Sequence, residues 1–299
     1  MPAKAKPTRR CHWVPQAYLK GFAADDRKPP RIWRFSKEGG DPELKRIDKV
    51  VVRNHLYVVS DDEGKRDDAQ ERRFASLEEL FGNPVWKELQ TGYVDLSDRA
   101  IRKMLSLLAA TTFVRHPAHL ELVKHVHRTF VDAYSGPSGP PSVVEIGGRR
   151  IEVDLASWPS YANASEDDLK RNWFDIMNSC VDIAEMFMDM RWSMLVADQP
   201  TFITSDRPVT MVHPDLQFRG IKDPKTMVMF PISPTRILNM DYMYNEPSNQ
   251  YYAVHDRGAC ANLLVWREAT EFMFLSRNPD EVCQELASLA DEFNDGNAV

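Results

Sequence analysis

The sequence predicts an α+β fold in which a mostly antiparallel sheet packs against long helices. Runs of expected strands and runs of expected helices follow one another in blocks, whereas a parallel βαβ array would alternate them regularly. The composition is that of a globular chain, because 43% of its 299 residues are hydrophobic and 27% are charged. The formal net charge of −6 gives no overall basic field that would attract nucleic acid, although a local basic face is compatible with it.

The sequence carries none of the patterns typical of secreted or membrane-spanning chains. Its N-terminus is basic, with Lys4, Lys6, Arg9 and Arg10, but no apolar h-region follows. No stretch approaches the ~18 consecutive apolar residues of a membrane span. The four cysteines lie far apart and form no C-x-x-C pair, which argues against a zinc site. We therefore expect a cytoplasmic protein with reduced thiols and no membrane partner.

We expect one domain over residues 11–299, preceded by a loose basic tail over residues 1–10. A segment rich in Gly, Pro and Ser at residues 135–142 is typical of a linker, and the residues after it are expected to form a hairpin that turns at Gly147-Gly148. Because the linker and hairpin are short, we interpret residues 135–153 as an insertion into this domain.

The first element of the domain is a short helix that begins at Pro15. Proline fits the first helical position, where its missing N–H costs nothing. Tyr18 and Phe22 then share one face and can anchor the turn in a core. His12 and Gln16 flank the helix start, where free backbone N–H groups favour an anion. These two residues either bind such an anion or satisfy nearby backbone groups.

The first long helix, expected over residues 67–88, carries an acid on its apolar stripe. Glu78 lies four residues after Phe74 and three before Phe81, so its carboxylate points to the buried face. Glu71 lies on the same line. A buried acid is costly unless a cation or hydrogen-bond donors meet it. Glu78 is therefore either half of a structural salt bridge or a functional carboxylate.

The next helix, with Ser97 as its expected N-cap, places a cation where an apolar residue is expected. Arg115 continues an apolar series with spacings of three and four residues: Ile101, Leu105, Leu108 and Thr112. A cation on this face needs a partner, and Glu78 is the kind of partner it requires. Pro117 should kink the helix just behind Arg115, after which the helix is expected to continue to Tyr134.

The remaining elements are mostly strands in the second half of the chain. In the first part of the chain, a strand is expected at residues 31–35, and either a strand pair or one long strand at residues 49–59. A Met-rich helix is expected at residues 166–190. Two further helices are expected at residues 248–266 and 280–293. The other expected strands follow the Met-rich helix, at residues 192–197, 201–204, 227–230, 236–240 and 271–275.

The strand at residues 201–204 leads directly into Ser205-Asp206-Arg207-Pro208. Pro208 favours extended geometry at Arg207, so Asp206 lies where the strand ends. Strand ends are common positions for functional side chains because a rigid element aims them. Asp206 is therefore a candidate site residue, and the alternative is that it caps a turn.

Four of these segments match, in order, motifs that recur in one group of proteins. His12, Pro15, Gln16, Tyr18, Leu19 and Phe22 fit H-x-x-P-Q-x-Y-L with a following phenylalanine, although Trp13 stands where tyrosine is more usual. Arg115 with Pro117 fits an R-x-P, and Thr204-Ser205-Asp206 with Pro208 fits a T-S-D-x-P. Residues 230–234 are similar to an L-P-[LI]-S-P segment. The chain thus resembles the domain-of-unknown-function 4238 family of mostly bacterial proteins, whose Glu-bearing helix corresponds to that of Glu78.

The resemblance supports the candidate residues but implies no reaction. The candidates come from four different expected elements, as in a pocket that the fold assembles: His12, Gln16, Glu78, Arg115 and Asp206. This combination suits phosphoester chemistry, in which Arg115 and the helix start hold a phosphate and His12 acts as general acid or base. Glu78 and Asp206 could bind Mg²⁺ or orient a water. We therefore predict a phosphodiester hydrolase acting on a phosphate-containing substrate or nucleic acid, such as a nuclease in bacterial defence or stress response.

The alternative is a non-catalytic ligand-sensing or binding protein whose buried polar network is structural. No Walker loop, G-x-S-x-G, H-E-x-x-H or dinucleotide fingerprint favours a particular enzyme class. Exposure distinguishes the two hypotheses, because an enzyme needs His12 and Asp206 at a cleft open to solvent, whereas a structural network is sealed.

Overall fold

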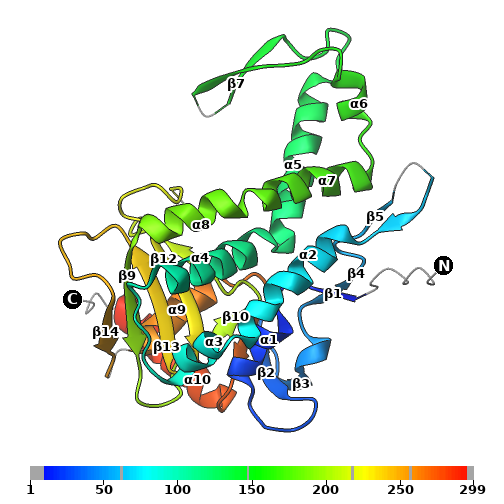
Figure 1. Cartoon of the computed structure of the whole chain (residues 1–299). Helices are drawn as coiled ribbons and strands as arrows, with labels where there is room; N and C mark the ends of the chain where they lie inside the picture. Colours follow the sequence, from blue (N-terminus) through cyan, green and yellow to red (C-terminus); the bar gives the residue numbers. More distant parts are fainter. Residues whose placement is uncertain (1–9, 61–62, 147, 217–218, 256–257, 295–299) are drawn as a thin grey trace.

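A computed structural model of the chain describes residues 10–60, 63–146, 148–216, 219–255 and 258–294 (Figure 1). The tail predicted over residues 1–10 lies outside the described residues except for Arg10, which begins strand β1 (Arg10–His12). The class is α+β, as predicted, with antiparallel sheets packed against helices. No helix among the described residues is long and apolar enough to cross a membrane.

A five-stranded sheet lies at the centre of the body, with the strand order β11-β12-β13-β9-β14. Its neighbours pair antiparallel except β14, which runs parallel to β9. Four of the strands are buried along most of their length, while β14 is partly exposed at the edge. Their bounds are β9 (Arg191–Val196), β11 (Thr210–Val212), β12 (Met227–Ser233), β13 (Arg236–Asp241) and β14 (Gln250–Ala253).

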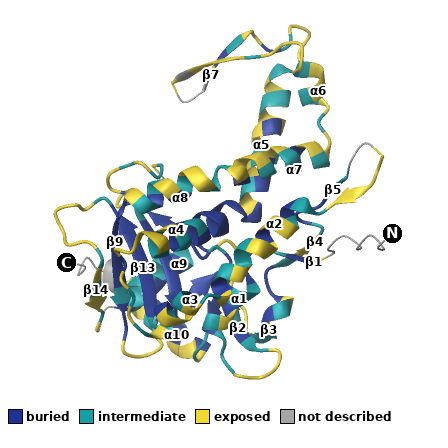
Figure 2. Ribbon diagram, viewed as in Figure 1, coloured by how far each residue is buried: buried dark blue, intermediate teal, exposed yellow. Residues whose placement is uncertain are grey.

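The two faces of this sheet bury different side chains, because successive residues of a strand point to opposite faces. On β9, Trp192 and Met194 belong to the largest core cluster, whereas Leu195 packs in a smaller cluster with residues of α9 (Ala259–Glu268). Among the helices that contribute to the largest cluster are α3 (Pro84–Thr91), α4 (Arg99–Val114) and α8 (Cys180–Asp189), whose buried residues are dark blue in Figure 2. These helices cover one face of the sheet, and α9 covers the other.

A second, four-stranded sheet has the order β10-β15-β2-β3 and is antiparallel throughout. Helices α9 and α10 (Pro279–Asn294) pack on it through a third apolar cluster that includes Val265 and Leu286. Helix α9 therefore lies between the two sheets. The strands of this sheet are β2 (Arg31–Ser36), β3 (Glu43–Arg46), β10 (Thr204–Ser205) and β15 (Phe272–Leu275).

Residues 49–59, predicted as a strand pair or one long strand, form mostly turns. Val51 and His55 have φ values of 46° and 54°, in the left-handed region, so the chain cannot run extended through them. What remains is a 3₁₀ turn and two short strands paired with β1 and with β6. Their bounds are η2 (Ile47–Lys49), β4 (Val52–Asn54), β5 (Val59–Ser60) and β6 (Arg66–Asp67).

The helix predicted over residues 67–88 is broken. It forms α2 (Ala69–Glu78), a 3₁₀ turn (η3, Glu79–Gly82) and α3. The break occurs because Asn83 accepts a hydrogen bond from the Val85 N–H at 2.8 Å and so caps a new helix that starts at Pro84. Likewise, His116 caps α5 (Pro117–Tyr134), so Pro117 starts a separate helix instead of kinking α4.

Two further predictions for long helices need correction. Residues 166–190 form two helices, α7 (Glu166–Asn178) and α8, joined at Ser179. The helix predicted over residues 248–266 begins only at Ala259, because the preceding residues form β14 and pair with β9. Instead of capping a helix, the Ser248 hydroxyl accepts a hydrogen bond from the Trp192 N–H. This pairing is tertiary, so local periodicity does not reveal it.

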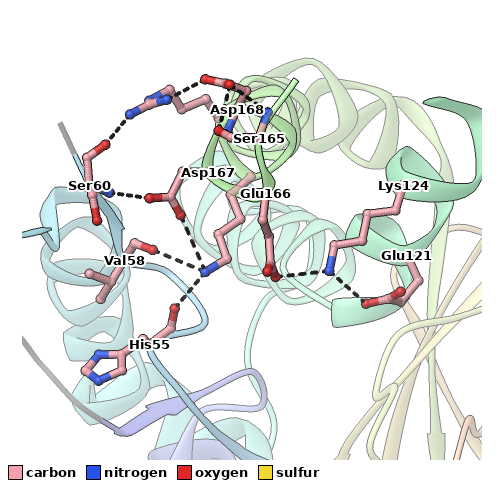
Figure 3. A network of polar contacts seen from close by, with 11 residues as sticks. His55, Val58, Ser60, Glu121, Lys124, Ser165, Glu166, Asp167 and Asp168 are labelled. Carbon is pink, nitrogen blue, oxygen red and sulfur yellow. Dashed lines mark hydrogen bonds and ion pairs between the residues drawn. The ribbon is translucent and has the colours of Figure 1, made fainter. Parts of the chain in front are cut away.

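Helices α5, α6 (Trp158–Ala162) and α7, with the hairpin of β7 (Val143–Ile146) and β8 (Arg149–Glu152), project from the body (Figure 1). The two hairpin strands confirm the predicted pairing, while residue 147 of the turn lies outside the described residues. Polar contacts connect α7, at the base of this projection, to residues 55–60 (Figure 3). Asp167 accepts from the Ser60 N–H at 2.7 Å, and Lys170 donates to the carbonyls of His55 and Val58.

Helix α4 begins one residue later than predicted, which gives a testable difference between neighbours. Asp98 Oδ1 accepts from the N–H groups of Ala100 and Ile101 at 2.7 and 3.2 Å, whereas Ser97 Oγ donates to Asp95. We expect Asp98→Ala to lower the free energy of unfolding by about 0.5–2 kcal/mol, and Ser97→Ala to change it by less than about 0.5 kcal/mol. Urea unfolding followed by circular dichroism measures both. Equal losses would contradict the assignment of Asp98 as the cap.

Candidate functional site

Arg115 lies at the centre of a buried polar network. Arg115 follows the last residue of α4, and Pro117 starts α5 two residues later. The Arg115 side chain therefore projects from the junction of the two helices. The residue is only 1% exposed. An arginine side chain keeps its positive charge in such a position. Protein groups must therefore replace the water that the guanidinium has lost.

Two oxygen atoms meet this guanidinium directly. Nη1 donates to Glu78 Oε1 at 2.9 Å, and Nη2 donates to the backbone carbonyl of His12. The ring of Phe74 lies 4.3 Å from Cζ and adds a cation–π contact. The pairing of Arg115 with Glu78 that helical phase suggested is confirmed. Among the described residues, Arg115 Nε has no hydrogen-bond partner although it is buried.

A second acid lies two turns before Glu78 on the same helix. Burial raises the pKa of Glu71, the positive charge of Arg115 opposes that shift, and the negative charge of Glu78 adds to it. Its Oε2 is buried without a hydrogen-bond partner in the part of the chain that the structure describes. The side chain of Glu78 is 29% exposed, so it reaches both Arg115 and solvent. The buried cation thus has two partly exposed acids nearby, of which Glu71 has a buried carboxylate oxygen.

His12, at the end of β1, contributes its backbone rather than its ring to Arg115. The ring is half-buried, and its Nδ1 lies 3.2 Å from the carbonyl oxygen of Val50. Burial lowers the pKa of His12, and the charges of Arg10 and Arg115 lower it further. A neutral ring facing a carbonyl carries its hydrogen on Nδ1, which leaves the lone pair on Nε2.

Gln16 is the first residue of α1 (Gln16–Leu19) and is half-buried. Pro15 caps this helix without a side-chain hydrogen bond and does not occupy its first position. Only four residues are α-helical before a 3₁₀ turn (η1, Lys20–Phe22) continues the chain. Because only a few peptide units are aligned, the helix dipole is weak, and the helix start by itself does not make an anion site.

Asp206 holds the beginning of strand β15. Its carboxylate accepts hydrogen bonds from the N–H groups of Thr270, Glu271 and Phe272 at 2.9, 2.7 and 3.3 Å. The residue is 1% exposed, and burial raises its pKa although the three N–H groups act in the opposite direction. Asp206 therefore binds backbone N–H groups of a segment more than sixty residues away along the chain, whereas the alternative interpretation expected it to cap a turn.

Two aromatic residues of the N-terminal segment link the family motifs to one another, and sequence reasoning assigned neither this role. Trp13 Nε1 donates to the backbone carbonyl of Asp206 at 3.1 Å. The Tyr18 hydroxyl donates to the Pro231 carbonyl at 2.8 Å and accepts from Thr204 Oγ1 at 2.7 Å. The Tyr18 ring also stacks on Phe230 at 5.5 Å between centroids. The signal was present in the sequence, since all these residues lie in the recurring motifs.

The structure thus connects four of the five predicted residues to one another. His12, Glu78 and Arg115 meet directly, although His12 does so through its carbonyl. Asp206 is connected to that group through Trp13, the neighbour of His12. Among the described residues, no polar contact connects Gln16 to that group. Tyr57, which sequence reasoning placed in a strand, completes the network because its hydroxyl donates to the Arg115 carbonyl at 2.7 Å.

The predicted metal ligands are engaged with protein groups. Glu78 pairs with Arg115, and both carboxylate oxygens of Asp206 accept backbone N–H groups. Within the described ranges, no group of three or more His, Cys, Asp or Glu side chains is arranged to hold a metal ion. Binding of Mg²⁺ by Glu78 and Asp206 therefore stays a prediction.

Three hollows of the described surface are lined by other residues. The first, of about 550 Å³, lies between the five-stranded sheet and α9. The second, of about 610 Å³, lies between α9 and α10, and the third lies beside the end of α8. None of the five predicted site residues lines these three hollows. The polar network and these hollows are separate features of the fold.

The pair formed by Glu78 and Arg115 predicts a specific coupling. Glu78→Leu leaves a buried guanidinium without its acid and should lower the free energy of unfolding by roughly 3–5 kcal/mol. Arg115→Leu should also destabilise, because the His12 carbonyl loses its donor. The double variant should lose clearly less than the sum of the two. A double-mutant cycle on urea unfolding measures this, with exposed Glu79→Leu as the control, and additive losses would rule out the pair.

Glu71 predicts a pH dependence of stability. Its pKa in the folded state is raised above the value of 4.5 expected for the unfolded chain. The folded state therefore binds the proton more tightly, so the contribution of Glu71 is full below that value and is lost as pH rises through the folded pKa. We expect the free energy of unfolding of Glu71→Gln, relative to that of wild type, to increase as the pH is raised from about 4 to about 7. Urea unfolding at both pH values checks this, and a constant difference would contradict it.

Comparison with known proteins gives one match. The model of a family described as a protein of unknown function, DUF4238, matches residues 10–251. This range includes all five predicted site residues, the Tyr18 bridge and most of the five-stranded sheet. No curated protein and no solved structure matches the chain.

Proposed function

This chain belongs to the DUF4238 family, and from the geometry of its polar network we propose that it is a non-catalytic ligand-binding protein in which that network is structural. One observation carries the proposal: the fold itself uses the charged groups of the predicted site. The guanidinium of Arg115 meets Glu78 and the His12 carbonyl, and the carboxylate of Asp206 meets three backbone N–H groups.

Burial supports the same conclusion. Arg115 and Asp206 are each 1% exposed, so a phosphate group would have to displace protein partners before it could reach either side chain. Displacement of the Glu78 carboxylate would exchange one buried ion pair for another and would leave the acid without its cation. A network of this kind fixes the positions of the segments it joins, which is the structural role that buried polar groups can have.

A phosphodiester hydrolase is the second candidate, and the state of His12 favours it. With Nδ1 facing the Val50 carbonyl, the lone pair of the neutral ring lies on Nε2, which suits a general base. The ring is half-buried, and the neighbouring Arg115 retains one buried N–H without a partner among the described residues. In this hypothesis, Arg115 would hold a phosphate, and Glu78 or Asp206 would bind Mg²⁺.

A hydrolysis assay distinguishes these candidates. We expect the purified protein with Mg²⁺ or Mn²⁺ to cleave bis(p-nitrophenyl) phosphate, single-stranded and double-stranded DNA and RNA no faster than its His12→Ala variant. His119→Ala is a matched control, because the ring of His119 also faces a backbone carbonyl, that of Phe113, at 3.1 Å.

The opposite result would establish the second candidate. If wild type and His119→Ala hydrolyse a substrate at least roughly tenfold faster than His12→Ala, and all three unfold within a few degrees of one another, then the His12 ring acts in catalysis. In that case the proposal of a non-catalytic protein is wrong.

A further inference from the structure

The hollow between the five-stranded sheet and α9 is a cavity of a size that suits a small molecule. Its volume of about 550 Å³ falls within the range of ligand pockets in proteins. It lies on the sheet face opposite the largest core cluster, between the sheet and helix α9, which is orange in Figure 1. The polar network around Arg115 contributes no residue to its lining.

Most of the cavity wall is apolar and adaptable. Leu195, Met227 and Met229 line it from the sheet, and Ala261 and Leu264 line it from α9. Methionine side chains have no branches and three rotatable bonds, so they can repack around occupants of different shape. A wall of this composition favours a hydrocarbon group.

One part of the wall is polar, where β9 and β13 lie side by side. Arg191 Nε and Nη2 donate to the two carboxylate oxygens of Asp241 at 2.7 and 2.6 Å, and Nη1 donates to the Pro247 carbonyl at 3.1 Å. The positive charge of Arg191 is therefore already matched by a bidentate carboxylate. This end of the cavity presents no free cation of its own among the residues named.

Asn239 lines the same part of the wall and leaves one hydrogen-bonding group unused. Its Nδ2 donates to Asp241 Oδ2 at 2.9 Å. Because a carboxylate can only accept hydrogen bonds, the amide nitrogen must face Asp241, and the remaining atom of the amide is the oxygen. Asn239 is 7% exposed, and its Oδ1 is buried without a hydrogen-bond partner among the described residues. A buried acceptor without a donor is costly to the protein.

We propose that this cavity binds a neutral amphiphile with one hydrocarbon chain and one O–H or N–H donor, and that the donor bonds to Asn239 Oδ1. The inference rests on the proposed function and names the ligand class of that binding protein. A carboxylate ligand does not fit, because it offers Oδ1 no hydrogen and Arg191 is paired with Asp241. The exposed Glu246 at the cavity wall would also repel an anion.

Two isomeric probes test the predicted donor. 1-Octanol and 1-methoxyheptane have the same atoms, but only the alcohol has an O–H group. In calorimetric titrations of the whole chain, we expect saturable binding of 1-octanol about three- to tenfold tighter than that of the ether, the effect of one hydrogen bond. Octanoate should bind more weakly than either. Equal affinities of alcohol and ether, or tightest binding of octanoate, would overturn the ligand class.

Three variants locate the site. Ala261→Phe fills the cavity from α9 and should lower the affinity for 1-octanol at least roughly tenfold, because the new side chain occupies the apolar space. Ala290→Phe on α10 is the matched control, since it lines only the second hollow and should leave the affinity unchanged. Asn239→Leu should abolish the preference for alcohol over ether while retaining binding of the ether.

The outcomes separate this inference from the proposed function. If 1-octanol binds equally to wild type and to Ala261→Phe, and circular dichroism shows that both proteins are folded, the cavity assignment is wrong. Absence of saturable binding to wild type overturns the ligand class as well. Neither result bears on the hydrolysis assay, which alone shows whether His12 is catalytic and whether the proposed non-catalytic role fails.

Discussion

The buried positive charge of Arg115 imposes the strongest physical constraint on the N-terminal half of the fold. A guanidinium that is 1% exposed must be met by acids and carbonyls, and its partners come from two separate parts of the chain, α2 and β1. Glu78 comes from the end of α2, the His12 carbonyl from β1, and Phe74 covers the guanidinium with its ring. Helix α4 ends just before Arg115, and α5 begins at Pro117. The Arg115 side chain therefore projects from the junction of the two helices to the point where these segments meet.

The segment from His12 to Tyr18 transmits this constraint to the sheets. Its backbone accepts from Arg115, Trp13 donates to Asp206, and Tyr18 bonds to Thr204 and Pro231. Asp206 in turn holds the start of β15 through three backbone N–H groups. The motifs that resemble the family therefore form a continuous chain of contacts from the helices to both sheets. Within this chain, these contacts satisfy buried polar groups of the motif residues.

The five-stranded sheet separates this network from the proposed ligand cavity. Trp192 and Met194 of β9 face the helices that pack on one side, whereas Arg191 and Leu195 line the cavity on the other. The two sides also differ in how their polar groups are satisfied. Arg191 and Asp241 form a closed pair, while Asn239 beside them retains an oxygen without a donor. A ligand that supplies this donor would complete the polar wall without disturbing the network around Arg115.

The sequence by itself determined the α+β class, most helices, and the unusual positions of Glu78 and Arg115, because periodicity records which face of an element is buried. It also suggested that those two side chains need each other. Only the tertiary structure decided that residues 250–253 pair with β9 and that Asp206 caps a distant strand. These two outcomes depend on hydrogen-bond partners far apart along the chain, which local patterns cannot encode. The helix breaks differ, because the caps at Asn83 and His116 accept from N–H groups only two residues further along the chain.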